Sequence, residues 1–408
     1  MSLVHHFLSG PGTLAEHVGV LFGVSRAENT LAERRAALPW ALFAGLLQAG
    51  LRPRAQERKH PQAFWRGWHL VALDGTTFSV SNTPQLTGAF AKAASRRLQA
   101  AFAKLNAVVL LELGLHNPLA LGRQGESEWA LALGLLAQLP KGALLLADRL
   151  YGCAAMLDRV QARCTAVGSH YLVRVRKTIK ARGVERLADG STLLEVPVHD
   201  PKKPRRVLRW LRVREVRVTV GRAGRKAETL RLWTSLLDPQ AAPALELARE
   251  YAQRWQHELY YREMKLALHT GELLQSHTPE TAAQEVAALV VATALIAQAR
   301  AAAAGAAVPV LRVSFVKLLA LVRALWLTLE LGAGARRAHP PKKSPPELSA
   351  GRATTRPRLA AQARPALDPR PADFRAPCPA TLKPRMALGL RGYLRDATDH
   401  NRLGFLMA

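Results

Sequence analysis

The spacing of hydrophobic residues changes from a helical to a strand period near residue 66. Before that point, apolar residues recur near helical spacing with charges between them, and Gly50 closes the run: Leu31, Leu38, Ala41, Leu42 and Leu46. The basic stretch 52–61 that follows is typical of a solvated linker. The pattern predicts an N-terminal helical region over residues 1–66.

Short apolar runs follow, and they are typical of strands. Three of them are His69–Leu73, Asn106–Leu113 and Leu119–Leu121. The first is expected to stop at the acidic turn Asp74-Gly75, and residues 116–118 are expected to turn the second strand back into the third.

A helix and a fourth strand come next. Ser127 is a suitable N-cap for a helix that ends at Pro140-Lys-Gly142. The run Ala143–Ala147 then predicts a strand that again ends at an acid, Asp148. Because a helix connects it to the earlier strands, this strand is expected to pair in parallel with one of them.

Residues 171–237 predict a basic, β-rich segment. We expect one strand face to carry Leu211, Val213, Val216, Val218 and Val220, with a bulge at Glu215, and the opposite face to carry Arg212, Arg214 and Arg217. Residues 205–231 hold ten Lys/Arg and two Asp/Glu. A merely solvated face is the alternative, but this surplus favours a sheet that faces DNA.

The C-terminal half predicts helices and a tail. Pro243 is expected to open one continuous helix through Leu268, and Ala- and Leu-rich helices follow over 278–333. The longest apolar stretch, Val286–Ala297, is shorter than the roughly 20 residues that span a bilayer, and the N-terminus lacks the pattern of a signal peptide. No membrane partner is expected. Residues 336–408 predict a basic tail rich in Pro and Arg.

Composition adds a partner class and a compartment. The 408 residues contain 58 Lys/Arg against 30 Asp/Glu, a net charge of +28, which favours nucleic acid as the partner. An apolar fraction of 49% excludes wholesale disorder. Three cysteines without a CxxC pair argue against a disulfide framework and a zinc ribbon, so a cytoplasmic setting is the simplest.

The candidate chemistry lies in acids at strand ends and on a later helix. Asp74 and Asp148 each follow an apolar strand, and at about 100° per residue Glu258 shares one helical stripe with Tyr251, Arg254 and Lys265. Such carboxylates can hold the divalent cations of phosphodiester chemistry. The rival acid Glu263 falls about 140° away from Glu258 and is expected to face solvent or to be paired. An exposed charged helix is the simpler interpretation of the stripe alone.

Three motifs in order resemble the bacterial DDE transposases of the IS-four family. They are Asp74-Gly-Thr with Asn82-Thr-Pro a few residues on, Asp148-Arg-Leu-Tyr-Gly152, and the spacing Tyr-x2-Arg-x3-Glu-x6-Lys over residues 251–265. The resemblance covers roughly residues 65–330. It implies an α/β fold with an RNase H-like mixed sheet over 67–335 and a β-rich insertion at about 172–240.

The resemblance also implies roles and partners. Asp74, Asp148 and Glu258 would be catalytic and hold two Mg²⁺ ions, with Mn²⁺ as a substitute. DNA contacts are expected from Tyr251, Arg254, Lys265, Arg149 and Tyr151, and from Arg212, Arg214 and Arg217 of the basic strand. The implied reaction is cleavage at the element's ends and transfer of the 3′-hydroxyl into target DNA by a homodimer. In some relatives a tryptophan of the insertion receives a flipped base; for Trp233, core packing is the favoured alternative.

Other function classes find no support. The chain contains no HExxH or Cys/His cluster, no GxSxG nucleophile motif and no Walker-type phosphate loop. Two alternatives stay open: a non-catalytic or domesticated DNA-binding protein, and an RNase H-like nuclease.

Overall fold

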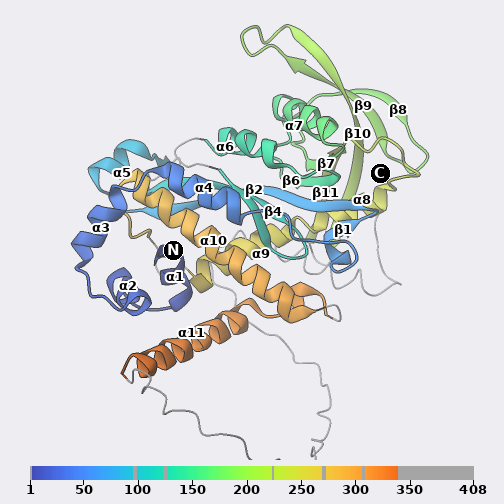
Figure 1. Cartoon of the computed structure of the whole chain (residues 1–408). Coiled ribbons are helices and arrows are strands. Elements are labelled where there is room, and N and C mark those ends of the chain that lie inside the picture. The colour runs from blue at the N-terminus through green and yellow to red at the C-terminus, as the bar shows by residue number, and fades with distance from the viewer. Residues whose placement is uncertain are drawn as a thin grey trace, which may run out of the picture.

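One eleven-stranded mixed sheet organises the protein, with helices on both of its faces (Figure 1). The computed structural model describes residues 2–94, 99–122, 127–222, 225–268, 273–305 and 308–338. Most of the predicted basic tail, from residue 339 on, lies outside these residues. The predicted α/β class with a mixed sheet is confirmed.

The N-terminal region is helical, as predicted. Its helices are α1 (Ser2–Ser9), α2 (Leu14–Phe22), α3 (Glu28–Ala36) and α4 (Trp40–Gly50). Thr13 caps α2 with a capping box, in which its side chain accepts from the Glu16 amide and Glu16 accepts from the Thr13 amide. Helices α1 and α4 pack against α10 (Pro279–Ala304), so this region covers one face of the molecule.

The strands of the first half are longer than the apolar runs that predict them. They are β1 (Phe64–Trp65), β2 (Trp68–Val80), β3 (Lys92–Ala94), β4 (Gln99–Glu112) and β5 (Asn117–Leu121). The prediction that the first strand stops at Asp74 is wrong. Strand β2 continues to Val80 because it stays paired with β4 as far as Val80↔Ala103, so Asp74 lies within a strand.

The predicted helix and parallel strand are both present. Ser127 caps α6 (Glu128–Leu135) by accepting from the Ala130 amide, and the 3₁₀ turn η2 (Leu136–Gln138) follows. Strand β6 (Ala143–Ala147) pairs in parallel with β2, and α7 (Ala154–Ala166) leads to β7 (His170–Arg174), which is parallel to β6.

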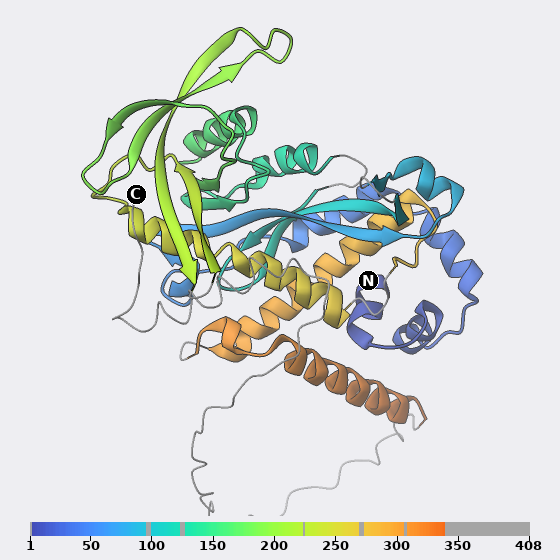
Figure 2. The same cartoon turned by 180° about the vertical axis from the view of Figure 1, so that it is seen from behind.

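The basic segment extends the same sheet. Its strands are β8 (Arg182–Arg186), β9 (Thr192–His199), β10 (Val207–Arg222) and β11 (Arg225–Thr234), and the sheet order is β3-β4-β2-β6-β7-β11-β10-β9-β8. The β9–β10 hairpin projects away from the rest of the molecule, as both views show (Figures 1 and 2).

The predicted bulge at Glu215 is wrong. The pairing of β10 is regular on both sides of this residue, and its register shifts lie between Val207 and Arg209 and between Val220 and Arg222. Regular alternation therefore places Leu211 and Val213 on one sheet face and Val216, Val218 and Val220 on the other. Both faces are buried here, so the two groups join different core clusters.

The predicted continuous helix from Pro243 to Leu268 is interrupted. The structure has α8 (Ala244–Ala252), a turn at 253–254, α9 (Trp255–Glu263) and the π-helical turn η3 (Met264–Leu268). The break is a tight turn, in which the Arg254 amide donates to the Tyr251 carbonyl and the His257 amide to the Arg254 carbonyl. Helix α10, the 3₁₀ turn η4 (Val310–Arg312) and α11 (Phe315–Ala338) complete the described chain.

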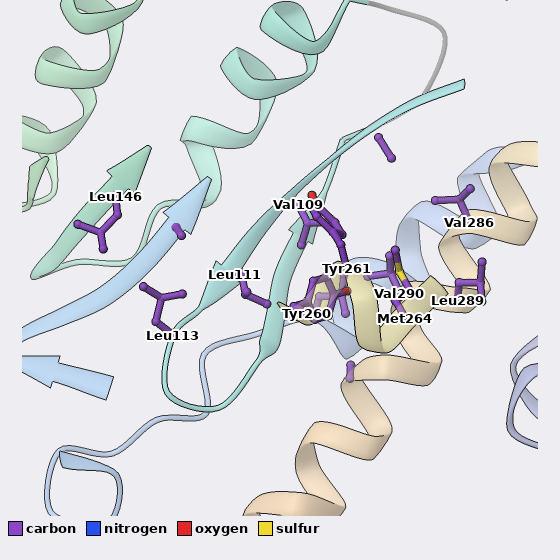
Figure 3. Close-up of a cluster of buried hydrophobic side chains, with 14 of the residues drawn as sticks. Val109, Leu111, Leu113, Leu146, Tyr260, Tyr261, Met264, Val286, Leu289 and Val290 are labelled. Carbon is purple, nitrogen blue, oxygen red and sulfur yellow. The ribbon is translucent and has the colours of Figure 1, made fainter. Parts of the chain in front are cut away.

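Two hydrophobic clusters fill the space on the two sides of the sheet. Helices α6 and α7 cover one of them. On the other side, Tyr260, Tyr261 and Met264 from α9 and η3 pack between β4 residues such as Val109 and Leu111 and the α10 residues Val286, Leu289 and Val290 (Figure 3). Packing against both the sheet and α10 fixes the position of α9, which carries Glu258.

Helix α10 is also the one described helix that is long and apolar enough to cross a bilayer. In its most apolar 18-residue window, 61% of the residues are buried inside the protein. A core helix passes the same test, and α10 packs as one, against α1, α4 and β5.

Candidate active site

Asp74 and Asp148 are brought together by parallel pairing of their strands. In the β2–β6 register, Leu73 is opposite Ala147, the last residue of β6. Asp74 and Asp148 are the next residues along the two strands. Strand β6 ends at Ala147, whereas β2 continues to Val80. Both aspartates therefore lie at the carboxyl end of β6. The sequence pattern predicted this juxtaposition, although it misplaced the end of β2.

The third acid comes from α9, on the sheet face toward which Asp74 points. Tyr261 of α9 donates its hydroxyl to the Asp74 carbonyl at 2.7 Å, which fastens the helix to β2. Arg254, at the break before α9, pairs its Nη1 with Asp74 Oδ2 at 3.0 Å. Despite the break before α9 and the π turn after it, Arg254 contacts Asp74 and Lys265 contacts Thr77 further along the same strand.

The charges of Asp148 and Glu258 both influence the pKa of Asp74. The pKa of Asp74 is raised to about 7, chiefly by burial and also by the charges of Glu258 and Asp148, against the opposing effects of Arg254 and the Gly75 amide. The same three acids raise the pKa of the Arg254 guanidinium against the opposing effect of its burial. Each acid therefore acts on the same cation.

Tyr251 and Lys265 complete the motif. The Tyr251 ring is 8% exposed, and within the described chain its hydroxyl has no hydrogen-bond partner. Its pKa is raised, chiefly by burial and also by Asp148 and Asp74. Lys265 donates to the Thr77 carbonyl at 2.9 Å, and burial together with Lys104 lowers its pKa to about 8 against the attraction of Glu258.

Glu263, the rival acid on this helix, is paired, which is one of the two predicted outcomes. Its carboxylate contacts His116 Nδ1 at 2.7 Å and Arg300 Nη1 at 3.1 Å. Its pKa is lowered because these two partners outweigh the effect of burial. Glu263 thus joins α9 to the β4–β5 turn and to α10, and Glu258 is the acid of this helix whose charge acts on Asp74.

The second motif surrounds Asp148 with structural contacts. A Cβ added at Gly152 would lie 2.4 Å from the Arg174 carbonyl, so only glycine fits where this loop crosses the end of β7. Tyr151 is 1% exposed and donates its hydroxyl to Glu128 Oε1 at 2.7 Å. The predicted role of Tyr151 as a surface contact for DNA is corrected by this burial, whereas Arg149 is exposed.

The predicted basic strand divides into buried and exposed arginines. Arg214 is 0% exposed; it pairs with Asp189 and donates to Ser191 Oγ at 2.7 Å and to the Ala242 carbonyl at 2.7 Å. Its predicted DNA contact is therefore wrong, because a buried guanidinium with these partners is structural. Arg212 and Arg217 are exposed, but regular alternation places them on opposite sheet faces.

Trp233 packs in the core, the favoured of its two predicted roles. Its side chain is 0% exposed, and the indole nitrogen donates to Glu215 Oε2 at 2.9 Å. Glu215 also accepts from Arg217 and Arg231, so the tryptophan belongs to a buried polar network on the sheet.

The residues present suit a divalent cation in chemistry and in charge. Asp148 Oδ1 is buried and has no hydrogen-bond partner in the described chain, and carboxylate oxygens are the ligands that Mg²⁺ prefers. As they stand, no three His, Cys, Asp or Glu side chains of the described ranges form a ready-made metal centre. In this structure the cation that faces Asp74 is the guanidinium of Arg254.

Comparison with known proteins identifies the family. The profile of the Transposase DDE domain family matches residues 68–295, from the start of β2 to within α10. The chain belongs to the DDE transposase family. The match contains all three motif acids and the whole β-rich segment between the second and the third.

Two relatives from Escherichia coli K12 agree with this assignment. The chain is 27% identical to the transposase InsG of insertion sequence element IS4 over 230 residues, which is 55% of this chain and 51% of InsG. It is 30% identical to the putative transposase InsZ over 141 residues, 33% of this chain and 46% of InsZ. The chain thus aligns with about half the length of these curated relatives, and the IS4-type resemblance found in the sequence is confirmed.

One residue at this site was missed by the sequence analysis. Glu128 begins α6 and accepts from Tyr151 beside Gly75. The available signal was the acid directly after the N-cap Ser127, but acids are common in the first helical turn, so the pattern alone does not separate this one.

Proposed function

We propose that this protein is a DNA transposase that cleaves the ends of its element and joins the freed 3′-hydroxyl to target DNA. The observation that carries the proposal is geometric: parallel pairing of β2 and β6 sets Asp74 beside Asp148, and Arg254, at the start of the helix that carries Glu258, pairs with Asp74 at 3.0 Å. Membership of the DDE transposase family supports the reaction class, since the family match spans all three acids.

Asp74, Asp148 and Glu258 would hold two Mg²⁺ ions, or Mn²⁺, which when bound activate the attacking oxygen and stabilise the leaving one. The positively charged side chains near these acids would bind the DNA phosphates. Arg254 and Lys265 lie at the two ends of the segment that carries Glu258, where they can position phosphate oxygens. The buried Tyr251 hydroxyl adds a hydrogen-bonding group near Asp148.

DNA would bind at the end of the sheet formed by β8, β9 and β10. Exposed cations cluster on β8 and on the β9–β10 hairpin: Arg182, Arg186, Lys202, Lys203, Arg205, Arg206 and Arg212. We infer that this hairpin and Arg149 bind the DNA backbone, and that the core from β2 to α10 is an RNase H-like domain. A homodimer would hold both terminal repeats together, and the reaction would take place in the cytoplasm.

The test compares two acid-to-amide variants on DNA that carries the inverted repeats flanking the gene. Glu258→Gln should abolish Mg²⁺-dependent strand cleavage and keep DNA binding, because it removes a charge at the site without changing its volume. Glu246→Gln is the matched control, since Glu246 pairs with Arg66 at the surface. Cleavage that survives Glu258→Gln would favour a different catalytic group. Binding without cleavage by the unaltered chain would favour the non-catalytic alternative.

A further inference from the structure

A fourth carboxylate stands against the backbone of the catalytic strand. Glu128, the first residue of α6, lies so close to Gly75 that a Cβ added there would be 2.2 Å from Glu128 Cδ and 2.3 Å from Oε1. Gly75 directly follows Asp74. This contact explains why the first motif has a glycine at position 75: any larger residue would collide with the Glu128 side chain.

The Glu128 carboxylate is oriented by the second motif. Tyr151 donates its hydroxyl to Glu128 Oε1 at 2.7 Å from a ring that is 1% exposed. Tyr151 also interacts electrostatically with Asp74, and Tyr261 interacts with both Asp74 and Glu128. Both tyrosines therefore interact with Glu128 as well as with Asp74, although Glu128 comes from the opposite sheet face.

The polar groups of this region are incompletely matched. Arg254 pairs with Asp74, while the buried Asp148 Oδ1 and the hydroxyl of Tyr251, which is more than nine-tenths buried, lack partners within the described ranges. A neutral amide at position 128 would accept the Tyr151 hydrogen bond equally well. A further negative charge against the residue that directly follows Asp74 is unfavourable unless a cation neutralises it.

We propose that Glu128 is a fourth acidic side chain of the active site and contributes to binding the divalent cation beside Asp74. This inference rests on the proposed function, since it assigns a residue to the cation site of that function. It gives roles to three motif residues together: Gly75 leaves the space, Tyr151 orients the carboxylate, and Glu128 supplies the charge.

The experiment measures Mn²⁺ binding to the full chain by the loss of the free-ion signal in electron paramagnetic resonance, without DNA. Glu128→Gln keeps the volume and the acceptor for Tyr151 and removes only the charge. We expect its Mn²⁺ affinity to fall about tenfold or more, with an unchanged Tm in the absence of metal. Glu246→Gln, a surface acid paired with Arg66, should bind Mn²⁺ like the unaltered chain.

A second variant displaces the carboxylate without deleting it. In Gly75→Ala the new methyl group takes the space of the Glu128 carboxylate, which is the movable end of a flexible side chain. Its Mn²⁺ affinity should fall as in Glu128→Gln. The double variant should be no worse than either single one, because both act through the same group.

The outcomes separate this inference from the proposed function. Asp74→Asn should remove Mn²⁺ binding at the active site. If the unaltered chain shows no Asp74-dependent binding, the proposed function fails and Glu128 loses its role with it. If Asp74→Asn removes binding while Glu128→Gln binds normally, the inference alone is wrong and Glu128 is only a hydrogen-bond acceptor that holds Tyr151.

Discussion

Residues of one type have different roles in this protein because their surroundings differ. Arg212 and Arg214 are two positions apart on β10 and on the same sheet face, but Arg212 is exposed and Arg214 is fully buried. The buried guanidinium ties β10 to Asp189 and to the loop before α8. A count of positive charges along the sequence treats both as DNA contacts, whereas burial separates them.

Replacing these arginines should separate stability from DNA binding. Arg214→Met leaves Asp189 and several carbonyl oxygens without their donor, so it should lower the free energy of unfolding by about 3–5 kcal/mol, measured by urea denaturation. Arg212→Gln should leave that free energy within about 0.5 kcal/mol of the original and weaken DNA binding. Equal stability of the two variants would contradict the structural role of Arg214.

Glu250 on α8 should make stability depend on pH. Burial, and secondarily the charge of Glu246, raises its pKa from 4.5 to about 7. The folded state therefore holds this proton more tightly than the unfolded state, and stability falls as the pH rises from about 4.5 to 7. Glu250→Gln should raise the Tm at pH 8 and change it little at pH 5. A gain of the same size at both pH values would show that ionisation is not the cause.

At the scale of elements, close backbone approaches hold the motif acids in place. The loop after β6 carries Asp148 and crosses the end of β7 at Gly152, and α9 is fastened to β2 through Tyr261. The sequence predicted these strands and the helical segment. It did not predict the break at Arg254, because a continuous 3.6-residue period fits the apolar positions equally well and only packing against the sheet favours the interruption.

The close contact at Gly152 predicts that replacing this glycine by alanine will destabilise the protein. In Gly152→Ala the new Cβ meets the main-chain carbonyl of Arg174, which no side-chain rotation can relieve. The loop must shift, so we expect a loss of about 1–3 kcal/mol in unfolding free energy and weaker Mn²⁺ binding.

The matched control is the same substitution in open space. At Gly134, inside α6, an added Cβ meets no atom within 4 Å. Gly134→Ala should therefore stabilise the helix by about 0.5–1 kcal/mol and leave Mn²⁺ binding unchanged. A similar stability for the two variants would argue against the close approach at Gly152.

At the scale of the whole molecule, the positive charge favours binding to the proposed partner, DNA. The net charge of +28 is carried in part by the exposed β9–β10 hairpin, which projects beyond the helices (Figure 2). Binding of such a surface to DNA releases counterions, and this term is independent of base sequence. In the proposed function this term supplies affinity and orientation, whereas the chemistry is assigned to Asp74, Asp148 and Glu258.

Salt should therefore weaken DNA binding steeply. With about six or more phosphate contacts, the dissociation constant should rise about a thousandfold between about 50 and 200 mM salt, measured by fluorescence anisotropy. Arg212→Gln should reduce the slope of log K against log salt by about one, because it removes a single contact. An unchanged slope in that variant would place Arg212 outside the DNA interface.

The strands β2, β4, β5 and β6 with the helix α6, the parallel pairing of β6 and the three motif acids follow from the sequence by itself. Local patterns encode them, since strand period, helix caps and motif spacing are short-range properties of the chain. The tertiary structure alone decided that both faces of β10 are buried, that Arg214 and Tyr151 are structural, and that Glu128 reaches Gly75 from α6. These depend on contacts between residues far apart in the chain, where packing between elements overrides local pattern.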